Sequence, residues 1–186
     1  MHLYYIVLIV ILIILLIFIS LRYIMVIKSP EYKFMESHSV KGVLEDVGKP
    51  HVAKALVLTC IDFRLLSEYV RFLSTIGYND NFDDFILAGA SLGFNQSVFP
   101  DWKSTFLEHL RLAQDLHHIK EIIVIDHMDC GAYKEFYNKP NISDQEERAL
   151  HIENLRKFRK YINENYKTLD VHCYLMDLDG TTKEIK

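Results

Sequence analysis

The stretch EIIVIDHMDCG, residues 121–131, contains the feature that decides the fold of this chain. Its first six residues include three isoleucines and a valine, which is typical of a strand that is buried on both faces. Strands of this kind belong to parallel sheets that helices cover on both sides. His127, Cys130 and Gly131 follow directly, so chemically active side chains lie where the predicted strand ends.

Segments of the same kind lie on both sides of this stretch. Short apolar runs at 53–59, 85–87 and 171–176 predict three further strands. Amphipathic spacing at 65–76, 104–116 and 143–161 predicts helices that alternate with the strands. The pattern predicts an α/β fold, with a mostly parallel sheet of about four strands flanked by helices. We place this domain at residues 51–186.

The first 28 residues have a different composition from the rest. Apart from Ser20, the segment from Leu3 to Leu21 is apolar or aromatic, and as a helix it would extend about 28 Å, close to the thickness of a bilayer core. A helix inside a protein core is rarely apolar all round, and a signal peptide would have a basic start and a small-residue cleavage site. We therefore predict a transmembrane anchor over 1–28 and a linker or short helix over 29–50.

The charges after this segment suggest an orientation. Arg22, Lys28 and Lys33 all follow the apolar run that ends at Leu21, and basic residues favour the cytosolic side of a membrane. We therefore expect a single-pass membrane protein whose C-terminal domain lies in the cytosol.

Net charge and cysteine content exclude some classes of function. The net charge of −4 argues against a nucleic-acid partner, which would need clustered Lys and Arg. The three cysteines, Cys60, Cys130 and Cys173, are an odd and sparse set that makes a poor disulfide framework. Metal binding or catalysis is a better interpretation for two of them, and a buried thiol for Cys173.

Cys60, His127 and Cys130 each follow or end a predicted strand. Ligand sites of open parallel sheets lie beyond the carboxyl ends of the strands, so these side chains are expected to meet there. Thiolate sulfur and imidazole nitrogen are preferred zinc ligands, and three protein ligands leave a fourth position open. Cys130 is expected at a helix start, where its thiol pKa would be lowered. The alternative is two buried structural cysteines and a capping histidine.

Asp62 and Arg64 lie two residues apart, immediately after Cys60. An Asp–Arg pair keeps the carboxylate ionised and fixes its orientation. Beside a metal ion, that carboxylate could accept a proton from bound water, so we predict a catalytic role for both residues. The alternative is an ordinary ion pair at the end of a strand.

The two motifs Cys60-Ile-Asp62-Phe-Arg64 and His127-Met-Asp-Cys130-Gly131 together resemble the signature of the β-class carbonic anhydrases. The similarity runs from about residue 53 to the C-terminus and is greatest to a divergent branch of that family. The resemblance implies a zinc lyase that reversibly hydrates CO2 to bicarbonate by zinc-bound hydroxide. It also implies one Zn2+ per chain on the two thiols and the imidazole, with the carboxylate, held by the arginine, orienting the hydroxide.

The resemblance further implies a substrate pocket near Ala88, Gly89 and Gly131, and pairing into homodimers or larger homo-oligomers. The expected partners are therefore CO2 and bicarbonate, a second copy of the chain, and a membrane through the N-terminal helix. Two other functions stay open: a related zinc hydrolase that acts on CS2, COS or another small electrophile, and a zinc-binding membrane protein without turnover.

Overall fold

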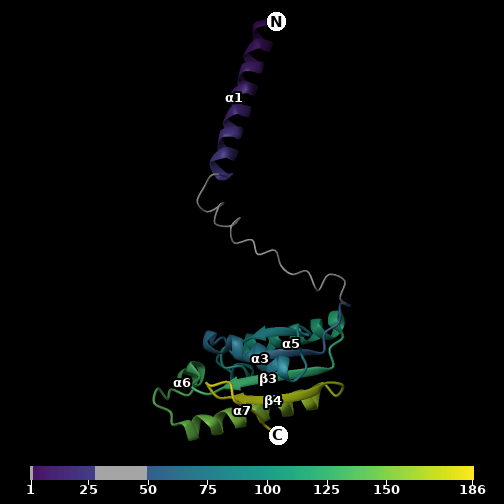
Figure 1. The fold of residues 1–186 in the computed structure, drawn as a ribbon, viewed down its shortest axis with the longest axis vertical. Helices are drawn as coiled ribbons and strands as arrows, with labels where there is room; N and C mark the ends of the chain where they lie inside the picture. Colours follow the sequence, from purple (N-terminus) through teal and green to yellow (C-terminus); the bar gives the residue numbers. More distant parts are fainter. Residues whose placement is uncertain (1, 28–49) are drawn as a thin grey trace. The chain divides into compact units, whose positions relative to one another are not determined.

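The chain divides into two compact units, Met1–Lys49 and Pro50–Lys186. The computed structural model describes residues 2–27 and 50–186 (Figure 1). The linker or short helix predicted over 29–50 lies outside the described residues, apart from its last residue.

The first unit contains one described helix, α1 (His2–Ile27). Among the residues that the structure describes, no helix combines the length and the apolar character that a membrane crossing requires. This finding contradicts the transmembrane anchor predicted over 1–28, and with it the single-pass membrane location.

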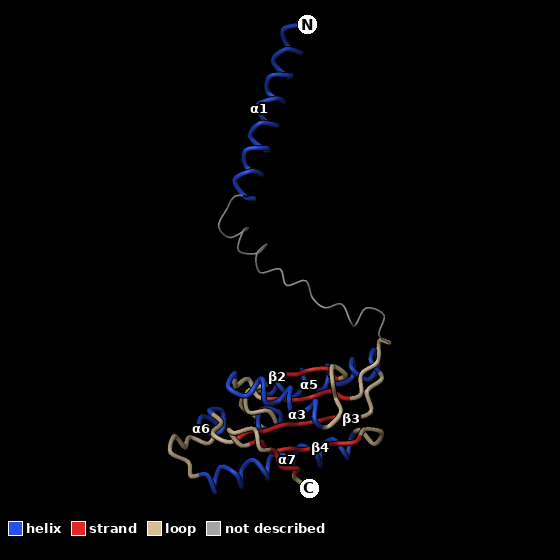
Figure 2. Tube along the Cα trace, viewed as in Figure 1, coloured by secondary structure: helices blue, strands red, loops and turns tan. Residues whose placement is uncertain are grey.

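The second unit is an α/β domain in which a central sheet is flanked by helices, as the strand and helix colours of Figure 2 make clear. Its elements along the chain are β1 (Ala55–Thr59), the 3-10 helix η1 (Phe63–Leu65), α3 (Leu66–Thr75), β2 (Phe82–Ile86), α4 (Ser91–Asn95), α5 (Pro100–His117), β3 (Glu121–His127), α6 (Gly131–Phe136), α7 (Asp144–Asn165), β4 (Asp170–Met176) and β5 (Thr182–Glu184).

The sheet has the strand order β2-β1-β3-β4-β5. The first four strands pair in parallel, and β5 pairs antiparallel with β4. The sheet is thus mostly parallel, as expected, but it has five strands where about four were predicted. The additional strand is three residues long and polar, so it has no apolar pattern by which it could be recognised.

The two faces of the sheet pack against different helices because side chains alternate along each strand. On one face, Leu58 and Val124 join a core that contains Phe106 of α5 and Phe158 of α7. On the other face, Val57 and Ile123 join a smaller core with residues of α3. This double cover explains why β1 is buried along its whole length and why β3 is buried beyond its first residue.

The strand order also determines where a ligand site can form. After β1 the chain moves to one side to make β2, and it then returns past β1 to make β3 on the other side. The connections therefore diverge at the carboxyl ends of β1 and β3, which is the position where open α/β sheets bind their ligands. Cys60 follows β1 directly and His127 ends β3, so both lie at this position.

Candidate metal centre

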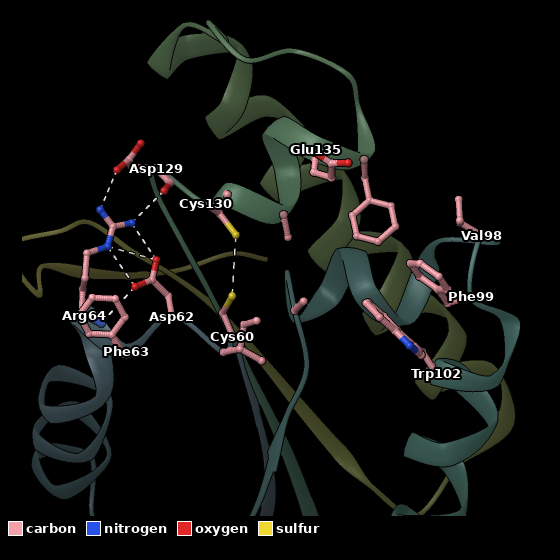
Figure 3. Close-up of a pocket in the computed structure, with 15 residues that line it drawn as sticks. Cys60, Asp62, Phe63, Arg64, Val98, Phe99, Trp102, Asp129, Cys130 and Glu135 are labelled. Carbon is pink, nitrogen blue, oxygen red and sulfur yellow. Dashed lines mark hydrogen bonds and ion pairs between the residues drawn. The ribbon is translucent and has the colours of Figure 1, made fainter.

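Three predicted side chains meet at the carboxyl end of the sheet. Cys60 follows β1, His127 is the last residue of β3, and Cys130 immediately precedes α6. One potential ligand atom from each lies within 4.8 Å of the other two, and all three residues are buried. The fold therefore brings together groups that are 70 residues apart along the chain (Figure 3).

The spacing of the two sulfur atoms fits a tetrahedral metal ion. Sγ of Cys60 lies 3.8 Å from Sγ of Cys130. Two Zn–S bonds of about 2.3 Å at a tetrahedral angle would separate the sulfur atoms by about 3.8 Å. The pair is not bonded as a disulfide.

The imidazole of His127 is prepared to present Nε2 as a ligand. Its Nδ1 lies 2.9 Å from the carbonyl oxygen of Met128, so Nδ1 carries a proton, and in the neutral imidazole the free lone pair is on Nε2. That Nε2 atom is buried and has no hydrogen-bond partner in the described part of the chain. A buried polar atom without a partner is costly, and a metal ion at the two sulfur atoms would satisfy it.

The two thiols differ in their readiness to ionise. The thiol of Cys130 donates a hydrogen bond that, against the effect of burial, lowers the pKa of Cys60 to about 4. The N–H of Gly89, 3.3 Å from the sulfur of Cys60, adds to this effect. The same contact raises the pKa of Cys130, and burial raises it further. Because either sulfur can donate the hydrogen bond that joins the two thiols, the first ionisation belongs to the pair.

Asp62 and Arg64 form a fixed ion pair beside the three ligand atoms. Nε of Arg64 lies 3.0 Å from Oδ1 of Asp62, and a second guanidinium nitrogen lies 2.7 Å from Oδ2. Arg64 also donates to the side chain and the carbonyl oxygen of Asp129, at 2.9 and 3.0 Å. The carboxylate of Asp62 borders the ligand group, with Oδ2 3.8 Å from Nε2 of His127.

Removal of the arginine should change the ionisation of its partner. Hydrogen bonds from Arg64 lower the pKa of Asp62 to about 2. A lowered pKa stabilises the fold above the ordinary value of 3.8, and this contribution is lost as pH falls from there through about 2. Between pH 6 and pH 3, the carboxyl carbon resonance of Asp62 should stay nearly constant in the wild type and should titrate in Arg64→Gln. Equal titration curves in the two proteins would contradict this assignment.

A pocket of about 800 Å³ opens in front of the two cysteines. One wall is polar and contains Asp62, Arg64 and Asp129, and the opposite wall is apolar (Figure 3). The apolar wall is formed by Ala88, Val98, Phe99, Trp102, Ala132 and Phe136, of which Phe99 and Trp102 stack at 4.7 Å.

The three residues predicted near the substrate pocket have different positions. Ala88 and Gly131 line the pocket. Gly89 is not among the lining residues, and instead its backbone supports Cys60. Gly89 adopts a φ of +74°, and a Cβ atom there would lie 3.1 Å from Cβ of Ala132. Glycine is therefore favoured at this position by backbone conformation and by space.

Sequence reasoning missed several residues that border this site. Asp129 was read only as a spacer within the second motif, although it has a φ of +58° and contacts Arg64. Phe99 and Phe136 of the apolar wall lie before α5 and on α6, and no periodic pattern distinguishes them. Glu147 and His151 of α7 are buried behind the site, and their spacing of four residues on one helix was a usable signal.

Fold and site together define an α/β protein whose sheet carries two thiols, an imidazole and an arginine-held carboxylate at its ligand-binding edge. Residues 51–186 match the family described as "Putative carbonic anhydrase", and the chain belongs to this family.

The chain is also similar to two proteins of known sequence and, in its fold, to a solved structure. An uncharacterized protein of Rickettsia bellii (strain RML369-C) is 38% identical over 151 residues, which cover 78% of this chain and 92% of that protein. An uncharacterized protein of Rickettsia conorii is 36% identical over 151 residues, covering 78% and 81%. The solved structure of a variant of a β-carbonic anhydrase of Aspergillus fumigatus matches this chain with a TM-score of 0.50 at 14% sequence identity. The match covers 75% of this chain and 92% of that one, and it shows a similarity of fold.

Proposed function

We propose that this protein is a zinc enzyme that reversibly hydrates CO2 to bicarbonate. The observation that carries the proposal is the group formed by Cys60, His127 and Cys130, with the carboxylate of Asp62 beside it in an open pocket. Two thiols and one imidazole are a common ligand set of catalytic zinc sites, in which the fourth position stays open.

The ligand group suits zinc chemically. Cys60, Cys130 and Nε2 of His127 would hold the ion, which would lower the pKa of a bound water and so supply a nucleophile at neutral pH. A dication would also favour the ionised form of both thiols, which in its absence compete for one proton.

The residues around the ligands have separate roles in this proposal. Asp62 stays ionised at neutral pH, so it accepts a hydrogen bond from the attacking water and orients it, while Arg64 keeps the carboxylate in place. The new bond joins the water oxygen to the carbon of CO2, one C=O electron pair moves to oxygen, and a proton leaves. A carboxyl with a pKa of about 2 does not retain that proton, which passes to solvent through the open pocket.

The direct test is stopped-flow CO2 hydration by the full chain after loading with zinc, with metal content measured on the same sample. We expect hydration that depends on enzyme and zinc concentration and is lost on chelation. A chain that contains one zinc ion but does not accelerate hydration would refute this function. That result would instead indicate that the protein binds zinc without catalysing a reaction.

A second candidate reaction is hydrolysis of CS2 or COS at the same site. The apolar wall that contains Phe99, Trp102 and Phe136 favours it, because this wall offers more apolar contact than CO2 needs. The same zinc-loaded chain should then release sulfide from CS2. Sulfide release without CO2 hydration would select this reaction over the first.

We also propose that two copies of the chain associate near the pocket. Ile61 and Phe63 at the pocket edge and Leu66 and Val70 on α3 are more than half exposed, and Phe63 is 87% exposed. Apolar side chains that gather in this way are typical of protein interfaces. A second copy is the simplest partner because a twofold interface matches a patch with itself.

The variant Phe63→Glu should weaken this association, because two carboxylates would be brought into an apolar contact. We expect the apparent mass from light scattering to fall from that of an oligomer toward the monomer. Leu116→Glu introduces the same charge at an exposed position of α5 and should leave the mass unchanged. A wild-type chain that is monomeric at all concentrations would refute the proposal.

A further inference from the structure

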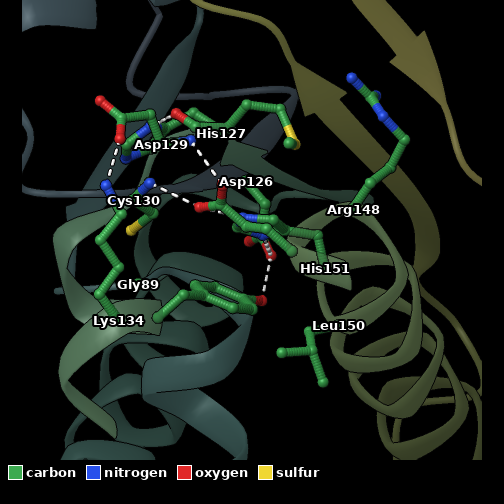
Figure 4. Close-up of polar contacts among 12 residues, drawn as sticks. Gly89, Asp126, His127, Asp129, Cys130, Lys134, Arg148, Leu150 and His151 are labelled. Atoms are coloured by element: carbon green, nitrogen blue, oxygen red, sulfur yellow. Dashed lines mark hydrogen bonds and ion pairs between the residues drawn. The ribbon is translucent and has the colours of Figure 1, made fainter. Parts of the chain in front are cut away.

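A buried group of charged side chains lies behind the metal ligands (Figure 4). It consists of Asp126, Glu147 and His151, whose exposed fractions are 1%, 3% and 0%. Charged residues are almost never buried to this degree unless they are paired. None of the three lines the pocket, so substrate contact does not account for them.

Asp126 connects the strand that bears His127 to three other segments. Its carboxylate accepts hydrogen bonds from the backbone N–H and the hydroxyl of Ser91, at 2.9 and 2.6 Å. It also accepts one from the hydroxyl of Tyr133 at 2.7 Å and one from Nδ1 of His151 at 3.0 Å. Ser91 lies two residues after Gly89, whose N–H contacts the sulfur of Cys60.

Glu147 holds the loop that bears the second cysteine. One carboxylate oxygen accepts the backbone N–H of Cys130 at 2.8 Å, and the other accepts that of Asp129 at 3.1 Å. Asp129 has a φ of +58°, an uncommon conformation for a residue with a side chain. These two hydrogen bonds therefore stabilise a strained turn that places the sulfur of Cys130.

His151 lies between the two carboxylates. Nδ1 contacts Asp126, whereas Nε2 lies 3.6 Å from an oxygen of Glu147 and has no hydrogen-bond partner in the described part of the chain. The ring lies against Tyr133, with centroids 3.6 Å apart. Burial alone would lower the pKa of His151, but Asp126 and Glu147 outweigh burial and raise it. The imidazole therefore separates the two buried carboxyl groups and contacts each of them through a different ring nitrogen.

We infer that His151 is a positioning residue for the metal centre. It acts through Asp126 on the segments that bear His127 and Cys60. It acts through Glu147 on the loop that bears Cys130. The inference rests on the proposed function only because it takes Cys60, His127 and Cys130 as metal ligands. Because Asp126 and Glu147 attach to different ligand segments, the imidazole between them sets the distance at which the segments meet. The expected consequence is higher metal affinity and a fixed ligand geometry, without contact between His151 and the ion.

The test compares metal binding by wild type, His151→Gln and the control His172→Gln. His172 is a partly exposed histidine of β4 that pairs with Glu121 at the start of β3, away from the ligands. Zn2+ affinity is measured by competition with a chelator, and ligand geometry by the thiolate-to-metal and d–d absorption bands of the Co2+ form. We expect His151→Gln to bind Zn2+ about 10- to 100-fold more weakly and to shift the Co2+ bands, and the control to match wild type.

The readouts separate the ways in which the idea could fail. A wild-type chain that binds neither ion refutes the proposed function itself. A wild type that binds, together with a folded His151→Gln of equal affinity and equal Co2+ spectrum, overturns the positioning role, even if the variant melts at a lower temperature. If His151→Gln does not fold, the variant Glu147→Gln provides the test. It should also bind Zn2+ more weakly than wild type and shift the Co2+ absorption bands. Wild-type affinity and a wild-type Co2+ spectrum in this variant would overturn the inference.

Discussion

Cys130→Ser should reduce the zinc content of the purified chain from one ion to nearly none. Serine keeps the size of the side chain but replaces a soft thiolate with a hydroxyl that does not ionise at neutral pH. The remaining thiol and imidazole form only two of three ligands. CO2 hydration should fall to the uncatalysed rate, because the source of the nucleophile is lost together with the ion. Metal content by mass spectrometry and stopped-flow hydration measure both effects.

Cys173→Ser is the matched control for this variant. Cys173 is also buried, but it lies in the core between β4 and α7, where its sulfur faces the carbonyl oxygen of Leu155 at 3.6 Å. It should lower stability without changing the zinc content. Unchanged zinc in Cys130→Ser would refute the ligand assignment, and loss of zinc in both variants would point to a general effect of unfolding.

Asp62→Asn should retain the ion and lose most of the catalytic rate. The amide has the same shape as the carboxylate, but it lacks the negative charge that Arg64 holds in place through two nitrogen atoms. An amide can also turn its NH2 group toward the attacking water and so orient it wrongly. We expect hydration to fall by about 100- to 1,000-fold, the range typical of a lost proton-accepting or preorganised polar group.

Zinc content is the readout that separates this effect from metal loss. One ion per chain should remain, since the ligand group consists of the other three residues. Glu135→Gln removes a different carboxylate from the pocket lining and should cost far less activity. An Asp62→Asn variant with the wild-type rate would remove the carboxylate from the mechanism.

Much of the fold could be predicted from the sequence because buried parallel strands have an unmistakable composition. β1 is apolar up to its last residue, β3 has a central run of four apolar residues, and their predicted positions agree with the structure to within two residues. β2 was harder to delimit because it contains Asp83 and Asp84 and is only partly buried at the edge of the sheet. The helix start expected at Cys130 agrees with α6, which Cys130 caps. The short helix α4 and the strand β5 were not predicted, since three to five residues hold too little periodicity.

The N-terminal segment illustrates the opposite case. Its composition led to the prediction of a membrane anchor over 1–28, and no helix in the described ranges 2–27 and 50–186 satisfies the requirements for a membrane crossing. The apolar character was read correctly, and the structural conclusion drawn from it was wrong.

Residue types and their positions were enough to predict which side chains form the candidate site. Residue types and their place after apolar strands pointed to Cys60, His127 and Cys130, because parallel strands deliver their carboxyl ends to one edge of the sheet. Only the tertiary structure decided how these groups are held. Three features depend on contacts between segments far apart in the chain. They are the 3.8 Å between the sulfur atoms, the Nε2 of His127 that has no hydrogen-bond partner among the described residues, and the buried charges behind them. Such contacts leave no periodic trace in a sequence, since each is set by the packing of several elements at once.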